Sequence, residues 1–140
     1  MVTADTFKRG FKNGISTFID LSKILIPVYL GVQLLATSGF LNILAEIFEP
    51  IMSIFGLPGE ASLIIILSYF LNIYAALGAI AAIELTTFQL TTIAIMISIA
   101  HSLIIETAIA KNLGVSATAV ILVRVFFSVT MGFLYYRIFG

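Results

Sequence analysis

Long apolar runs, separated by short segments with proline, glycine or charged residues, constrain the fold of this sequence more than any other feature. Four such runs cover residues 23–44, 61–83, 88–110 and 116–138. Each has the length of about 20 residues that an α-helix needs to cross the hydrocarbon core of a bilayer. The pattern therefore predicts an all-α, polytopic membrane protein with about four full spans.

The composition and the connections support this class. Charged residues make up 10% of the chain, whereas soluble domains carry about 25%, so the chain has too little polar surface to fold in water. The apolar runs are continuous, unlike the alternating strands of about ten residues in membrane barrels. The connections at residues 84–87 and 111–115 are tight, which predicts that consecutive spans pack as antiparallel neighbours.

The segment at residues 49–60 is apolar between its helix breakers and too short to span. Pro50 is expected to begin a helix, Gly56 to end it, and Pro58 with Gly59 to prevent its continuation. We therefore expect a broken or re-entrant helical hairpin here, of the kind that builds sites in transporters. An ordinary interfacial turn, with Glu60 capping the next helix, remains the alternative. A re-entrant segment would leave four crossings and place both termini on one side.

Residues 1–22 form an amphipathic N-terminal segment, and residues 23–140 form the membrane domain. Apolar residues recur at helical spacing in the N-terminal segment and basic residues fall largely opposite them: Phe7, Phe11, Ile15 and Phe18 against Lys8, Arg9 and Lys12. This pattern is typical of a helix at a membrane surface, and a helical lead-in to the first span is the alternative. The basic cluster favours a cytoplasmic N-terminus.

Polar residues inside the apolar runs are the candidates for function, because ionisable groups within a membrane are costly. Asn72 lies near the middle of its run. Folding the last two runs about a turn at residue 114 brings Arg124 near the depth of His101, with Glu106 about one turn away. The long arginine side chain can cover that offset, so we expect an ion pair between Glu106 and Arg124, either structural or functional. His101 lies five residues before Glu106. That spacing puts the two on different faces of one helix, so His101 is either a packing residue or a separate proton or ligand site.

Several function classes are excluded or disfavoured. The net charge of zero leaves no basic surface for nucleic acid. The chain has no cysteine, no zinc-protease motif, no P-loop and no dinucleotide fingerprint. We therefore expect no enzyme activity, no cofactor and no metal site.

At Glu49-Pro50-Ile-Met-Ser-Ile-Phe-Gly56-Leu-Pro58-Gly59-Glu60 and at His101-Ser-Leu-Ile-Ile-Glu106, the chain resembles the nucleoside-recognition or Gate family of bacterial membrane proteins. That family includes spore maturation proteins A and B and the Gate domains of ferrous-iron transporter B. The resemblance implies paired units, often of opposite orientation, with broken helices near the centre. It also implies transport or membrane assembly. The iron transporter's domains use a pore cysteine, which this chain lacks.

The expected function is membrane transport of a small solute or ion by a homodimer, whose two copies are either parallel or inverted. The alternative is a non-transporting assembly subunit that works with a second Gate-type protein. We expect a multi-pass location in the bacterial cytoplasmic membrane, with the bilayer and another copy or Gate-type protein as partners. The candidate substrate- or ion-binding residues are Glu49, Pro50, Gly56, Pro58, Gly59, Glu60, Asn72, His101, Glu106 and Arg124.

Overall fold

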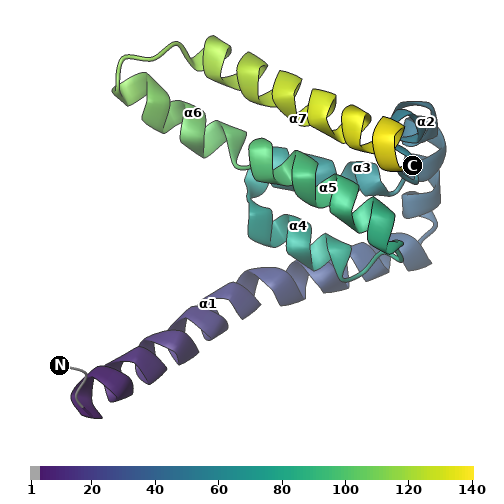
Figure 1. Cartoon of the computed structure of the whole chain (residues 1–140). Coiled ribbons are helices and arrows are strands. Elements are labelled where there is room, and N and C mark those ends of the chain that lie inside the picture. Colours follow the sequence, from purple (N-terminus) through teal and green to yellow (C-terminus); the bar gives the residue numbers. More distant parts are fainter. Residues whose placement is uncertain (1–3) are drawn as a thin grey trace.

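Helix α1 (Ala4–Thr37) extends well beyond the other helices in the computed structural model, which describes residues 4–140 (Figure 1). Its 34 residues measure about 50 Å at about 1.5 Å each, more than the hydrocarbon core of a bilayer. The helix runs without interruption through residue 22, where the sequence divides the surface segment from the first span. Residues 1–3 of that segment lie outside the described residues. The helix ends at Thr37 rather than near residue 44, because Gly39 adopts a φ of 78° and turns the chain.

Helix α2 (Phe40–Met52) and the 3-10 turn η1 (Ser53–Phe55) follow this turn. Pro50 lies inside α2 near its C-terminal end, so the expectation that it begins a helix is wrong. A proline there removes one backbone donor from the last turns, which weakens the helix only where it already ends. Gly56 ends the 3-10 turn with a φ of 66°, as expected.

The apolar run at residues 61–83 forms a hairpin of two short helices instead of a membrane span. Helix α3 (Ala61–Ile66) continues into a π-helical turn η2 (Leu67–Leu71), and α4 (Ile73–Ile80) then packs back against both. Asn72 is fully extended between them, with φ −167° and ψ 168°. Its side-chain oxygen accepts a hydrogen bond of 2.9 Å from the Ala75 amide and so caps α4.

The small residues of α4 allow this hairpin to lie close to α1. Ala75, Ala76 and Ala79 are buried. A Cβ at Gly78 would lie 2.9 Å from the Leu25 carbonyl oxygen, so α4 approaches the α1 backbone closely.

Helices α5 (Thr87–Ile99) and α6 (Leu103–Asn112) together form one broken span, and α7 (Ala117–Phe139) returns beside them. The break covers residues 100–102, where Ser102 has a φ of 49°. Within residues 4–140, three segments are long and apolar enough to cross a membrane: Asp5–Thr37, Thr87–Asn112 and Ala117–Phe139.

The core lies where α3, α4 and α5 meet, and its centre includes the fully buried Ile64, Ala76 and Ile93. Many large apolar side chains remain on the outer surface; Phe126 on α7 is 64% exposed. Such a surface suits contact with lipid rather than water. The predicted all-helical class is confirmed. The helical hairpin lies at residues 61–80, after the segment at residues 49–60 where it was expected.

A candidate site where two helix breaks meet

The tip of the hairpin and the break in the α5–α6 span touch through their backbones. The Ser102 amide donates a hydrogen bond of 2.8 Å to the carbonyl oxygen of Ser68 in η2. Ser68 is fully buried. Backbone outside regular helices survives at membrane depth only where protein or enclosed water satisfies its polar groups. The two irregular segments therefore support each other.

Three ionisable side chains gather beside this junction. The guanidinium of Arg124 forms an ion pair with Oε2 of Glu106, as expected, and its Nε donates to the Ile99 carbonyl at 3.0 Å. Nε2 of His101 lies 3.4 Å from the other Glu106 oxygen, Oε1, and Nδ1 lies 3.1 Å from the Ile97 carbonyl. The expectation that His101 and Glu106 lie apart is wrong. The break between them removes the regular helical spacing on which it rested.

The ion pair also lines a cavity between α6 and α7. This space measures about 360 Å³ and is lined by Glu106, Ile109, Ala110, Leu113, Val120 and Arg124. The side chains of His101, Glu106 and Arg124 retain between 25% and 33% exposure. The charged groups are therefore paired with each other yet reachable from outside the helix bundle.

In the described part of the chain, three buried hydroxyl groups lack a partner, two of them on the elements of the junction and one at the far end of α3. The hydroxyls of Ser62, Ser68 and Thr107 are buried without a hydrogen-bond partner among the described residues. A buried polar group costs stability unless a water molecule or another group satisfies it. Sequence analysis missed Thr107, because an isolated threonine in an apolar helix resembles any packing residue.

The motif at residues 49–60 lies at the opposite end of α3 from the helix breaks. The amide of Gly59 donates a hydrogen bond of 3.0 Å to Oε2 of Glu49, which joins α2 to the beginning of α3. A Cβ at Gly59 would overlap the Ala45 carbonyl, and one at Gly56 would overlap the ring of Tyr136. Glu60 makes no side-chain cap, contrary to the alternative interpretation of this segment. These contacts hold helices together.

The sequence candidates thus divide into two groups. The structure brings His101, Glu106 and Arg124 together at the broken span, and it places Asn72 at the hairpin tip, directly after η2. The motif residues lie elsewhere: Glu49 and Pro50 belong to the end of α2, and Gly56, Pro58, Gly59 and Glu60 form the connection between η1 and α3.

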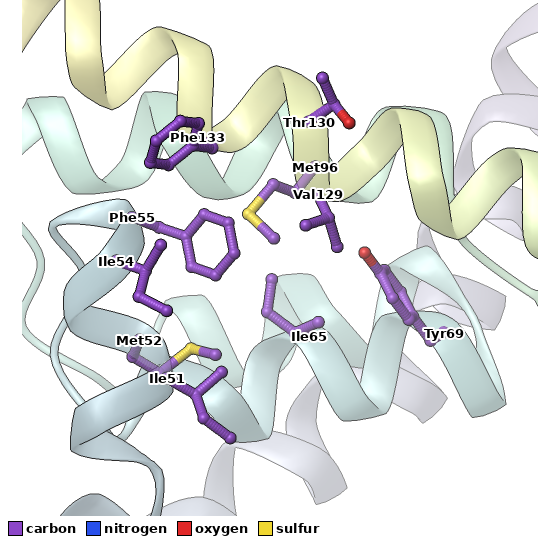
Figure 2. A pocket seen from close by; sticks show the side chains of 10 residues that line it. All are labelled: Ile51, Met52, Ile54, Phe55, Ile65, Tyr69, Met96, Val129, Thr130 and Phe133. Carbon is purple, nitrogen blue, oxygen red and sulfur yellow. The ribbon is translucent and has the colours of Figure 1, made fainter.

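A second cavity, of about 480 Å³, lies between α2, α3, α5 and α7 and is almost entirely apolar (Figure 2). Among its side chains, Tyr69 and Thr130 carry hydroxyls. The Tyr69 hydroxyl lies 2.5 Å from that of Ser128, which donates to the Met96 carbonyl at 2.8 Å. Sequence analysis missed this chain of hydrogen bonds, which ties the hairpin to α5 and α7. Because Tyr69 is already engaged, this cavity offers little to a polar solute.

Comparison with known proteins places these features in a family. A family model described as "Gate: Nucleoside recognition" matches residues 18–116, which include the motif at residues 49–60 and both helix breaks. The chain is 34% identical over 119 residues to "Uncharacterized membrane protein YvoD" of Bacillus subtilis (strain 168). The match covers 85% of this chain and 38% of that relative. No solved structure matches.

Proposed function

Because the chain belongs to the Gate (nucleoside recognition) family of membrane proteins, we propose that it transports a small solute or ion across the bacterial cytoplasmic membrane. The observation that carries this proposal is the hydrogen bond between Ser102 and Ser68, which joins the α3–α4 hairpin to the break between α5 and α6. Transporters form substrate and ion sites from such discontinuous helices, because helix ends present unpaired backbone groups near the bilayer midplane.

The proposed solute site consists of polar groups at this junction. Asn72 stands at the hairpin tip, and His101, Glu106 and Arg124 form the charged cluster on the broken span. The residues of the motif at 49–60 act indirectly, by holding α2 against the beginning of the hairpin. Binding and release need no covalent chemistry, so the proposed function is not enzymatic.

A second copy would complete the site. One hairpin and one broken span enclose only one side of the junction, and the charged side chains keep an exposed fraction of 25% to 33%. The chain spans 38% of the length of its relative, which leaves room there for a further unit of similar size. We propose that two copies of this chain, inverted with respect to each other, provide together what one longer chain would contain.

Flux measurements in vesicles test the transport function. The purified protein is reconstituted, and uptake of radiolabelled uridine, adenosine and sodium ion is compared with uptake by protein-free vesicles. The nucleosides are chosen from the description of the family model. We expect uptake of at least one probe. Absence of uptake of every probe, by protein that is folded and oligomeric, would contradict the proposal.

A variant at the hairpin tip tests whether uptake depends on the polar groups of the junction. Asn72→Ser keeps an oxygen that can cap α4 but removes the amide. We expect it to lower uptake about tenfold, which corresponds to one lost hydrogen bond, without loss of folded protein. The control Leu122→Ala changes a side chain on α7 that is 64% exposed and does not line the cavity beside the ion pair. Equal uptake by both variants would remove Asn72 from the site.

The second candidate is an assembly subunit that pairs with a different Gate-type protein. The match to 38% of the longer relative favours this candidate as much as the homodimer, because a different chain could supply the part of the relative that this chain lacks. Purification from native membranes in mild detergent distinguishes the two. A second membrane protein at equal stoichiometry supports the assembly function, and a homogeneous homodimer supports transport.

A further inference from the structure

The hydrogen bond at Nδ1 of His101 determines which nitrogen of the ring carries a proton. Nδ1 lies 3.1 Å from the Ile97 carbonyl oxygen. A carbonyl oxygen can only accept, so Nδ1 must be the donor in this contact. In a neutral imidazole with a proton on Nδ1, Nε2 has none and presents a lone pair.

This lone pair would face a second acceptor. Nε2 lies 3.4 Å from Oε1 of Glu106, and an ionised carboxylate also only accepts hydrogen bonds. Two acceptors at this distance repel each other, whereas a proton on Nε2 makes the ring an imidazolium that attracts the carboxylate. We propose that His101 and Glu106 form a binding site for a single proton, held between Nε2 and Oε1.

The neighbouring charged groups leave this position open to a proton. Arg124 on α7 pairs with the other oxygen of Glu106 and with the Ile99 carbonyl. On the hairpin, the Tyr69 hydroxyl is directed to Ser128, and Tyr74 lies beyond the tip on α4. Helix α5 has no titratable side chain, and Lys111 lies in the last turn of α6.

The site is accessible, and its geometry depends on the helix break. Glu106 borders the cavity of about 360 Å³ between α6 and α7, so its carboxylate is not sealed inside the helix bundle. Nε2 reaches Oε1 because Ser102, with a φ of 49°, bends the chain between the two residues. Straightening the span would separate them. Proton occupancy is therefore coupled to the bend, and its coupling to solute movement rests on the proposed transport function.

The chain contains one histidine, so nuclear magnetic resonance of protein labelled with ¹⁵N-histidine reports the site directly. The full-length protein is placed in lipid nanodiscs, and both ring nitrogens are followed as the pH is changed. We expect Nδ1 to stay protonated throughout and only Nε2 to lose its proton as the pH rises. A neutral ring with its proton on Nε2 would overturn the proposal.

Two carboxylate variants assign the effect to Glu106. Glu106→Gln replaces the acceptor with an amide that can donate to a neutral Nε2, so we expect the proton occupancy of Nε2 to fall. Glu84→Gln, in the exposed connection before α5, should leave the occupancy of Nε2 unchanged. Equal occupancy in the wild type and in Glu106→Gln, with helicity and elution volume preserved, would show that the pair is only structural.

These measurements do not depend on transport. If Nε2 responds as expected but no probe crosses the vesicle membrane, the proton site stands and the transport proposal fails. If uptake occurs while Nε2 fails to respond, transport stands and the proton site is wrong. If both hold, uptake of the transported probe should increase with an imposed proton gradient in the wild type and lose that dependence in Glu106→Gln.

Discussion

At the scale of single residues, Gly59 is the position where the backbone geometry is most demanding. A Cβ there would overlap the Ala45 carbonyl of α2, and the same residue donates its amide to Glu49. We predict that Gly59→Ala destabilises the protein by about 1–3 kcal/mol, because neither backbone can move away without breaking the turn. Gly14→Ala, where nothing lies within 4 Å of the added Cβ, is the matched control. Thermal unfolding in detergent compares the two; equal midpoints would contradict this packing.

The ion pair between Glu106 and Arg124 is also a residue-scale feature, and its energy depends on its partial exposure. Buried pairs cost about 3–5 kcal/mol when one partner is removed, and exposed pairs up to about 1 kcal/mol. The side chains are 33% and 25% exposed, so we predict a loss of about 2 kcal/mol for Arg124→Met. The double variant Arg124→Met with Glu106→Gln should lose less than the sum of the single variants. Chemical denaturation in micelles gives the free energy of unfolding of the wild type, the two single variants and the double variant. Strict additivity of the two losses would argue against a direct ion pair.

At the scale of elements, the hairpin of α3, η2 and α4 depends on the cap at its tip. The Asn72 side chain satisfies the Ala75 amide at the beginning of α4. We predict that Asn72→Ala lowers stability by about 1 kcal/mol and increases hydrogen exchange in α4, because that amide loses its partner. Asn72→Ser should restore most of the protection. Unchanged exchange in Asn72→Ala would mean that packing against α1 alone holds α4.

The hairpin is also tied to α7 by the hydrogen bond between Tyr69 and Ser128. Tyr69→Phe removes that hydroxyl while preserving the ring. We predict a loss of about 1 kcal/mol, since Ser128 keeps its hydrogen bond to the Met96 carbonyl. Tyr74→Phe, on the more exposed face of α4, serves as the control. A similar change in unfolding midpoint for both variants would show that the Tyr69 hydroxyl contributes nothing specific.

At the scale of the whole molecule, the number of spans determines where the termini lie. Three candidate spans, together with a hairpin that does not cross, put the two termini on opposite sides of the membrane. Figure 1 likewise shows the N- and C-termini at opposite ends of the molecule. Four crossings would instead place them on one side. The chain has no cysteine, so one can be introduced at Asn13 or appended after Gly140 and labelled with a membrane-impermeant thiol reagent.

We predict that each terminus labels from both sides in about equal amounts, because the proposed homodimer contains one copy in each orientation. If each terminus labels from one side only, on opposite faces, the three-span topology holds and the inverted homodimer is wrong. If both termini label from the same face, the hairpin must cross the membrane, contrary to its packing of α4 against α3.

The sequence by itself determined the class of protein, the family motif and most of the polar residues of the candidate site. Charge content, run length and helix breakers are local properties, so they were sufficient for an all-helical membrane protein and for the turn at Gly56. They also predicted the ion pair of Glu106 with Arg124, because a tight turn between two antiparallel helices leaves little freedom in their register.

Only the tertiary structure decided that residues 61–83 fold back at Asn72 and that His101 meets Glu106. Hydropathy is the same for a spanning helix and for a hairpin of equal composition. The choice depends on distant partners: α1 packs against α4, and the Ser102 amide satisfies the carbonyl of Ser68. Helical spacing likewise separates His101 from Glu106 only while the helix continues. The left-handed backbone at Ser102, which the hairpin supports, brings their side chains together.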